Sequence, residues 1–145
     1  EQISVMGVSA GATLSLMALA DPETEGLAIG VVSAFGLYDL EVLTGLLVGT
    51  ISSLSVNSRK AEVQRAHSPL HTRQTRLPVL LLHGSEDGLV PVAQARHMKA
   101  ERDACELPSE LVIYEGQPHG FFCLQSEATR RSVTDILGFL DACHD

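Results

Sequence analysis

The hydrophobic residues of this chain gather in four short runs, separated by polar stretches that contain glycine or proline. The sequence LAIGVVSAF suits a strand covered on both faces, because its apolar residues do not alternate with polar ones. The sequence LPVLLLHG is the strongest strand signal of the four. The runs cover residues 3–6, 27–35, 77–84 and 109–116, and they predict four β-strands.

The stretches between and after these runs predict helices. Residues 10–20 are rich in alanine, leucine and methionine and are apolar nearly all round, which predicts a buried helix. Residues 91–105 open with a proline suited to a first helical turn and then repeat apolar residues at helical spacing. A last helix is expected over residues 125–143. Its apolar stripe, at i, i+3, i+4 and i+7, is Val133, Ile136, Leu137 and Leu140.

The region from about residue 37 to residue 76 gives a mixed signal. The sequence LEVLTGLLVG reads as a helix weakened by glycines, NSRKAEVQRA as a polar helical piece, and HSPL as a turn. We interpret this region as a small cap-like insertion within a single domain that covers residues 1–145.

The alternating order of strands and helices predicts an α/β fold with a mostly parallel sheet and helices on both faces. A sheet of four strands leaves one long edge uncovered. The first strand also begins only two residues after Glu1, which is not a methionine. We therefore expect a preceding segment with further strands, or a second chain, to complete the sheet.

Composition narrows the possible partners. The formal net charge of −8 argues against binding to nucleic acid or to an anionic membrane, since both need a basic patch. Neither a signal peptide nor an apolar run of the ~18 residues that cross a bilayer is visible. The three cysteines form no C-x-x-C pair, so neither a zinc site nor a disulfide framework is indicated, and reduced thiols favour the cytoplasm.

A serine stands between two glycines where the first strand meets the first helix. The sequence GVSAG at residues 7–11 matches the pattern G-x-S-x-G, with a predicted strand before it and a predicted helix after it. A sharp turn there strains the serine backbone, and we expect side chains at Gly7 and Gly11 to clash. The turn projects the Ser9 hydroxyl away from the sheet. The N–H of Ala10, at the start of the helix, is then available to a developing oxyanion.

A nucleophilic serine needs a base, and the base needs a carboxylate that orients it. Asp87 follows the third predicted strand, and His119 follows the fourth in a loop with glycine and proline. Functional residues of open parallel sheets lie beyond the carboxyl ends of strands, where Ser9 also lies. Glu86 is an alternative acid, which we rank below Asp87 because Gly88 permits a tight turn. The remaining histidines, at positions 67, 71, 83, 97 and 144, are interpreted as structural or surface residues.

These motifs resemble the C-terminal half of an α/β-hydrolase of the esterase/lipase and prolyl-oligopeptidase-like branch. GVSAGA is similar to the nucleophile elbow, LPVLLLHGSEDGLVPVAQA to the acid-bearing strand and loop, and YEGQPHGF to the histidine loop. The resemblance implies that Ser9 is the nucleophile, Asp87 the acid, His119 the general base and Ala10 one oxyanion donor. It also implies about four earlier strands and a second oxyanion donor on an earlier loop, none of which is present here. We therefore expect catalysis by a longer protein rather than by these 145 residues alone.

The expected reaction is cleavage of a carboxylic ester with a short acyl chain, through an acyl-enzyme and without metal or cofactor. The alternatives are a serine peptidase of the prolyl-oligopeptidase type and a non-catalytic binding module that keeps the fold. The substrate-binding residues are unknown. Four apolar residues of the insertion either line an acyl pocket or merely cover the sheet: Leu43, Leu46, Leu47 and Val48.

Overall fold

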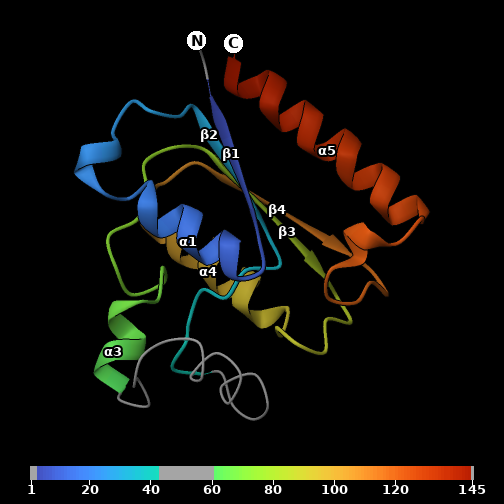
Figure 1. The fold of residues 1–145 in the computed structure, drawn as a ribbon, viewed down its shortest axis with the longest axis horizontal. Coiled ribbons are helices and arrows are strands. Elements are labelled where there is room, and N and C mark those ends of the chain that lie inside the picture. Colours follow the sequence, from blue (N-terminus) through green and yellow to red (C-terminus); the bar gives the residue numbers. More distant parts are fainter. Residues whose placement is uncertain (1–2, 43–60, 145) are drawn as a thin grey trace.

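The computed structural model describes residues 3–42 and 61–144, which form one parallel sheet flanked by helices (Figure 1). The sheet has the order β1-β2-β3-β4, and each neighbouring pair is parallel. The α/β class and the four predicted strands are thereby confirmed. The strands are β1 (Ser4–Val8), β2 (Gly30–Ala34), β3 (Val79–Gly84) and β4 (Ser109–Tyr114).

Helices cover both faces of the sheet, as predicted. Helices α1 (Ala10–Ala18) and α4 (Ala93–Ala104) lie on one face, and α5 (Glu127–His144) lies on the other (Figure 1). Shorter elements are α3 (Ala61–Ala66) and the 3₁₀ turns η1 (Pro22–Thr24) and η2 (Phe121–Cys123). Within the described residues, no helix combines the length and apolarity needed to cross a bilayer.

The central strands β2 and β3 are buried along their whole length and supply residues to two separate cores. Val31 and Leu81 pack with Leu16 and Met98 on the side of α1 and α4. Val32 and the neighbouring β3 residues Leu80 and Leu82 pack with Phe139 of α5 and with Phe121 on the opposite side. Because successive strand residues point to opposite faces, an unbroken apolar run fills both cores.

The predicted orientations of two helices are only partly right, since Ile136 and Leu140 of α5 do pack against the core. Val133 and Leu137 of α5 are 52% and 56% exposed, whereas Phe139 is only 6% exposed. The helix is rotated because the Phe139 ring lies against Gly30, which has no side chain to keep it away. Helix α1 is not buried all round either, since Leu14 is 66% exposed.

The predicted insertion begins inside the core. Tyr38 is fully buried, and its hydroxyl forms a 2.8 Å hydrogen bond with that of Ser33 on β2. Burial raises the pKa of Tyr38 to about 12, so this phenol remains neutral. Residues 43–48, including the four proposed pocket residues, lie outside the described residues, and a cap formed by this region stays a prediction.

Candidate active site

Ser9 stands at the sharp turn between β1 and α1. Its φ and ψ angles are 52° and −122°, a strained conformation that non-glycine residues rarely adopt. Its backbone N–H donates a 2.9 Å hydrogen bond to the carbonyl of Ala34 at the end of β2. The strain predicted from the G-x-S-x-G pattern is confirmed, and neighbouring backbone holds the serine in place.

Only one of the two flanking glycines is required by space. A Cβ atom at Gly7 would lie 2.3 Å from the carbonyl oxygen of Gly11 and 2.6 Å from Oγ of Ser15. A Cβ atom at Gly11 would meet nothing within 4 Å, so the predicted clash at this position is wrong. Gly11 already lies in α1, and a side chain at this position would point into open space. The carbonyl group of Gly11 is what excludes a side chain at Gly7.

This difference gives a matched pair of variants. Gly7→Ala is expected to lower the free energy of unfolding by about 3 kcal/mol, because backbone must move to admit the methyl group. Gly11→Ala is expected to leave it unchanged or raise it by up to about 1 kcal/mol, because alanine favours helix over glycine. Urea unfolding of both variants measures the difference. Equal losses in the two would contradict the steric account.

Three predicted side chains meet beyond the carboxyl ends of the strands. The Nε2 atom of His119 lies 3.0 Å from Oγ of Ser9, and its Nδ1 atom lies 2.7 Å from Oδ2 of Asp87. Since the carboxylate can only accept, Nδ1 carries the proton and Nε2 accepts the hydrogen bond of the hydroxyl. Residues 110 positions apart in sequence therefore form one continuous relay.

Asp87, rather than Glu86, faces the histidine. The side chain of Asp87 is fully buried, while Glu86 is exposed. Oδ1 of Asp87 accepts hydrogen bonds from the N–H groups of Leu89, at 2.9 Å, and Val90, at 2.7 Å, which leaves Oδ2 to His119. Burial alone would raise the pKa of Asp87, but donors from the surrounding side chains and backbone hold that pKa below its usual value.

His83 also contacts the carboxylate, a role that the sequence analysis missed. Its Nε2–H donates a 2.9 Å hydrogen bond to the carbonyl of Val90 and lies 3.3 Å from Oδ2 of Asp87. The ring is fully buried at the end of β3. The sequence did offer a signal for this contact, because His83 lies at the carboxyl end of β3, only four residues before Asp87. His83 is thus a positioning residue that favours the ionised form of Asp87.

Two variants of His83 separate this role from simple packing. His83→Gln keeps an N–H near the position of Nε2, and His83→Leu does not. A depressed carboxyl pKa stabilises the fold above the unfolded pKa of about 4, and the gain is lost as pH falls through the folded pKa. We therefore expect the leucine variant to be about 1–2 kcal/mol less stable than the glutamine variant at pH 7. The gap should narrow below about pH 4, and a gap independent of pH would contradict this role.

Phe35 is a second neighbour that the sequence analysis did not identify. It directly follows β2 with a φ of 40°, and its ring meets that of His119 edge-on, with centroids 4.9 Å apart. The ring of Phe122 packs on the ring of Phe35, with centroids 5.2 Å apart. The Phe35 ring covers one side of the imidazole and keeps water from it, which strengthens the hydrogen bonds of His119 to Ser9 and Asp87.

Ala10 is the first residue of α1, directly after Ser9. The first N–H groups of a helix have no partner within that helix, and they lie at its positive end. The location of Ala10 is therefore compatible with its predicted role as an oxyanion donor, which stays a prediction.

The comparisons with known proteins identify the family of this chain. The family model described as "Prolyl oligopeptidase family" matches residues 1–145, the whole chain. The chain belongs to the prolyl oligopeptidase family. The chain is also 29% identical over 162 residues to Esterase LipQ of Mycobacterium tuberculosis. This match covers 95% of this chain and 38% of that protein.

Solved structures share the fold of this chain. The chain resembles the uncomplexed acylaminoacyl peptidase of Pyrococcus horikoshii with a TM-score of 0.81 and 20% identity, over 97% of this chain and 24% of that one. It resembles a puromycin-hydrolyzing peptidase of Mycobacterium tuberculosis with a TM-score of 0.77 and 25% identity, over 94% of this chain and 21% of that one. This family member thus spans 24% and 21% of the two peptidase structures and 38% of the curated esterase.

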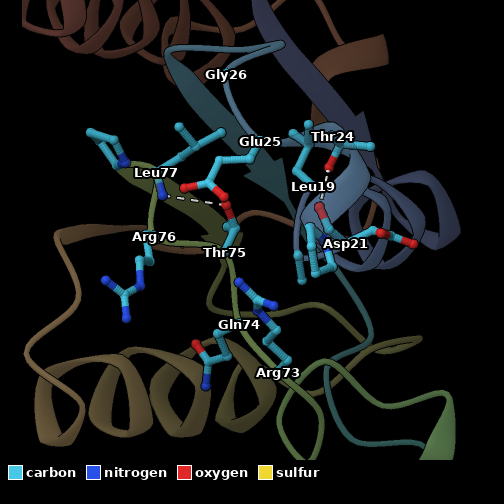
Figure 2. Close-up of a pocket in the computed structure, with 13 residues that line it drawn as sticks. Leu19, Asp21, Thr24, Glu25, Gly26, Arg73, Gln74, Thr75, Arg76 and Leu77 are labelled. Carbon is cyan, nitrogen blue, oxygen red and sulfur yellow. Dashed lines mark hydrogen bonds between the residues drawn. The ribbon is translucent and has the colours of Figure 1, made fainter.

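A hollow of about 180 Å³ lies away from the relay (Figure 2). It is bounded by the end of α1, by the η1 turn and by the segment from Arg73 to Pro78, which leads into β3. Figure 2 shows Thr75 and Leu77 on one side and Leu19 and Thr24 on the other. The hollow is therefore at the amino end of β3, whereas Asp87 follows its carboxyl end, and it has no part in the reaction considered below.

Proposed function

We propose that the protein is a serine hydrolase that cleaves carboxylic esters with short acyl chains. The observation that carries the proposal is the relay from Ser9 through His119 to Asp87 at the carboxyl ends of three parallel strands. Similarity to an esterase over 95% of this chain supports ester substrates. Because the chain spans only 38% of that esterase, the activity is proposed for the protein as a whole.

In the proposed reaction, Oγ of Ser9 attacks the ester carbonyl while Nε2 of His119 takes the hydroxyl proton. Asp87 holds the tautomer with a proton on Nδ1 and stabilises the imidazolium that forms. The N–H of Ala10 donates to the oxyanion. The imidazolium returns its proton to the leaving alcohol, and an acyl group remains on Ser9. Water then repeats the two steps with His119 as base and releases the acid.

A peptidase is the second candidate, because the similar solved structures include acylaminoacyl peptidases and the family is named for a peptidase. The elbow geometry serves esters and amides alike, so the choice depends on substrate contacts. Comparing kcat/KM for p-nitrophenyl acetate with that for a proline anilide separates the two. The proposal predicts a clear preference for the ester, and a preference for the anilide would favour the peptidase.

The same assay tests the non-catalytic alternative. An acyl-enzyme mechanism releases p-nitrophenolate in an initial burst that scales with protein concentration. A binding module that keeps the fold would release none above the rate in buffer. Absence of both the burst and the steady-state release would overturn the proposed function.

A further inference from the structure

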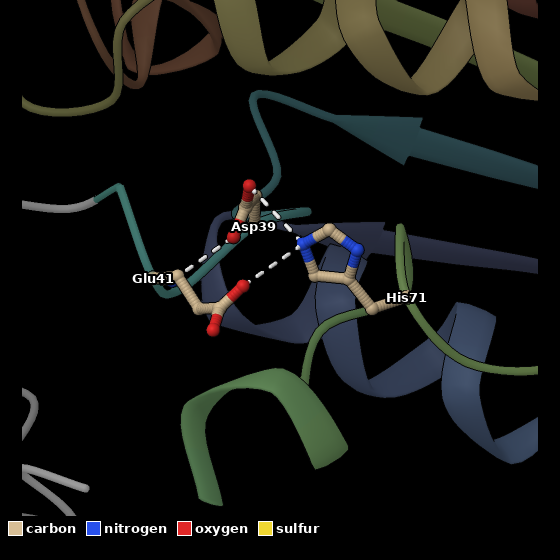
Figure 3. Close-up of side chains that lie close together, drawn as sticks. All are labelled: Asp39, Glu41 and His71. Carbon is tan, nitrogen blue, oxygen red and sulfur yellow. Dashed lines mark hydrogen bonds and ion pairs between the residues drawn. The ribbon is translucent and has the colours of Figure 1, made fainter. Parts of the chain in front are cut away.

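A second cluster of titratable side chains joins the two ends of the predicted insertion (Figure 3). Asp39 and Glu41 lie on the loop that follows β2, and His71 lies on the loop that leads to β3. The Nε2 atom of His71 is 3.3 Å from Oδ2 of Asp39 and 3.4 Å from Oε2 of Glu41. Figure 3 shows both carboxylates turned toward this one nitrogen.

The histidine nitrogen lacks the hydrogen bond that its position would suggest. Nε2 of His71 is buried and forms no hydrogen bond of acceptable geometry among the described residues, although two carboxylates face it. Its distances to both oxygens exceed the 2.9 Å typical of N–H···O bonds. A nitrogen that points between two acceptors, without a good hydrogen bond to either, has the arrangement of a metal ligand.

The spacing of the three atoms fits a small divalent ion. Zinc binds imidazole nitrogen and carboxylate oxygen at about 2.0–2.2 Å in a tetrahedron, which puts neighbouring ligand atoms about 3.3–3.6 Å apart. The two distances to Nε2 fall in this range, and all three ligand atoms lie within 4.8 Å of one another. A shift of less than about 1.5 Å in the Glu41 side chain would complete three corners of the tetrahedron.

Hydrogen bonds to the backbone of the first loop hold the cluster in place. Oδ1 of Asp39 accepts a 2.9 Å bond from the N–H of Glu41, which leaves Oδ2 facing His71. Oε1 of the buried Gln94 side chain accepts from the N–H of Asp39 at 2.7 Å, and its amide donates to the carbonyl of Asp39 at 2.9 Å. Oγ of Ser68 accepts from the N–H of Leu40 at 2.8 Å, which ties the two loops together. The loop that carries Asp39 and Glu41, and the Asp39 carboxylate itself, are therefore preorganised.

Charge favours a cation at this place. Two carboxylates face one nitrogen, and Arg65 pairs with Glu41 at 3.2 Å. The side chain of Arg65 is 61% exposed, so this pair is worth little and competes weakly with an ion of charge +2. Imidazole as one of three ligands selects a transition-metal ion over Mg²⁺ or Ca²⁺, which prefer oxygen.

We propose that Asp39, Glu41 and His71 bind one Zn²⁺ ion, with water as the fourth ligand. The ion would fasten the start of the insertion to its end and so fix the loop that leaves β2. The role is structural and separate from the Ser9 relay. The other interpretation of the same atoms, a protonated His71 paired with two carboxylates, predicts no affinity for metal.

Titration calorimetry of chelator-treated protein with ZnCl₂, under reducing conditions, tests the proposal. We expect one tight equivalent of Zn²⁺ and a higher melting temperature in its presence. His71→Ala should weaken this equivalent at least ~100-fold, since loss of even an outer partner of a metal ligand costs 10–100-fold. The exposed His67, whose Nδ1 bonds to the carbonyl of Val63, is the matched control, and His67→Ala should bind as the wild type does.

Asp39→Asn tests whether a weaker binding of Zn²⁺ could result from loss of folding rather than from loss of a ligand. Asparagine keeps an oxygen to accept the N–H of Glu41, so the loop is preserved while the ligand charge is removed. This variant should bind Zn²⁺ as weakly as His71→Ala and keep the wild-type circular dichroism spectrum. Co²⁺ in the wild type should give the intense visible bands of a tetrahedral site. The proposal would be overturned if the wild type bound no tight equivalent of Zn²⁺. It would also be overturned if His71→Ala still bound a tight equivalent and alkylation of the cysteines removed it.

Discussion

Replacing Ser9 with alanine is expected to reduce ester turnover by at least ~10⁴-fold, because no other group would attack the carbonyl. Oγ of Ser9 lies 3.0 Å from the nitrogen that takes its proton, and alanine removes that atom alone. The fold should persist, since the φ of 52° is tolerated in the wild type by a residue that also carries a Cβ. The measurement is kcat for p-nitrophenyl acetate, together with the circular dichroism spectrum.

Ser15→Ala provides the control for this variant. Ser15 lies on α1, the helix that follows Ser9, and among the described residues its hydroxyl bonds locally, to the carbonyl of Ala12 at 3.1 Å. Its loss should change kcat less than about twofold, because alanine suits a helix and the hydroxyl makes none of the hydrogen bonds of the relay. Equal kcat values in the Ser9 and Ser15 variants would mean that the observed hydrolysis does not use the elbow.

Asp87→Asn is expected to lower kcat by about 10⁴-fold while the site remains folded. The asparagine amide would donate to Nδ1 of His119, which moves the imidazole proton to Nε2. The histidine then presents a donor to Ser9, at the 3.0 Å contact, and cannot take the serine proton. Measuring kcat across pH 5 to 9 tests this, because the loss should persist over the whole range.

Glu86→Gln is the matched control, since Glu86 is adjacent, exposed and of the same charge. It should leave kcat nearly unchanged. If Glu86→Gln abolished activity and Asp87→Asn did not, the acid would be assigned to the wrong one of two neighbouring residues.

The positions of the candidate site residues could be predicted because they depend on topology. The six residues of β3 are all buried, so the apolar run identified the strand without ambiguity. Once the sheet is parallel, its carboxyl ends share one edge, and loops after different strands must approach each other there. The structure brings Ser9, Asp87 and His119 within hydrogen-bonding distance, while their catalytic roles stay a prediction.

Features that depend on contacts between distant elements could not be predicted. The rotation of α5 is set by the approach of Phe139 to Gly30, and periodicity within the helix favoured a neighbouring stripe instead. The need for glycine at position 7 but not at position 11 follows from the direction of each Cα–Cβ bond. The contact of His83 with Asp87, and the meeting of Asp39 with His71, likewise need coordinates.

The most direct test of the central claim is the site of covalent labelling by a fluorophosphonate, mapped by mass spectrometry of peptides. The account predicts one phosphonyl group per protein, attached to Ser9, and almost none in the His119→Ala variant, where nothing takes the serine proton. Labelling at another residue, or labelling of Ser9 that proceeds equally fast without His119, would contradict it.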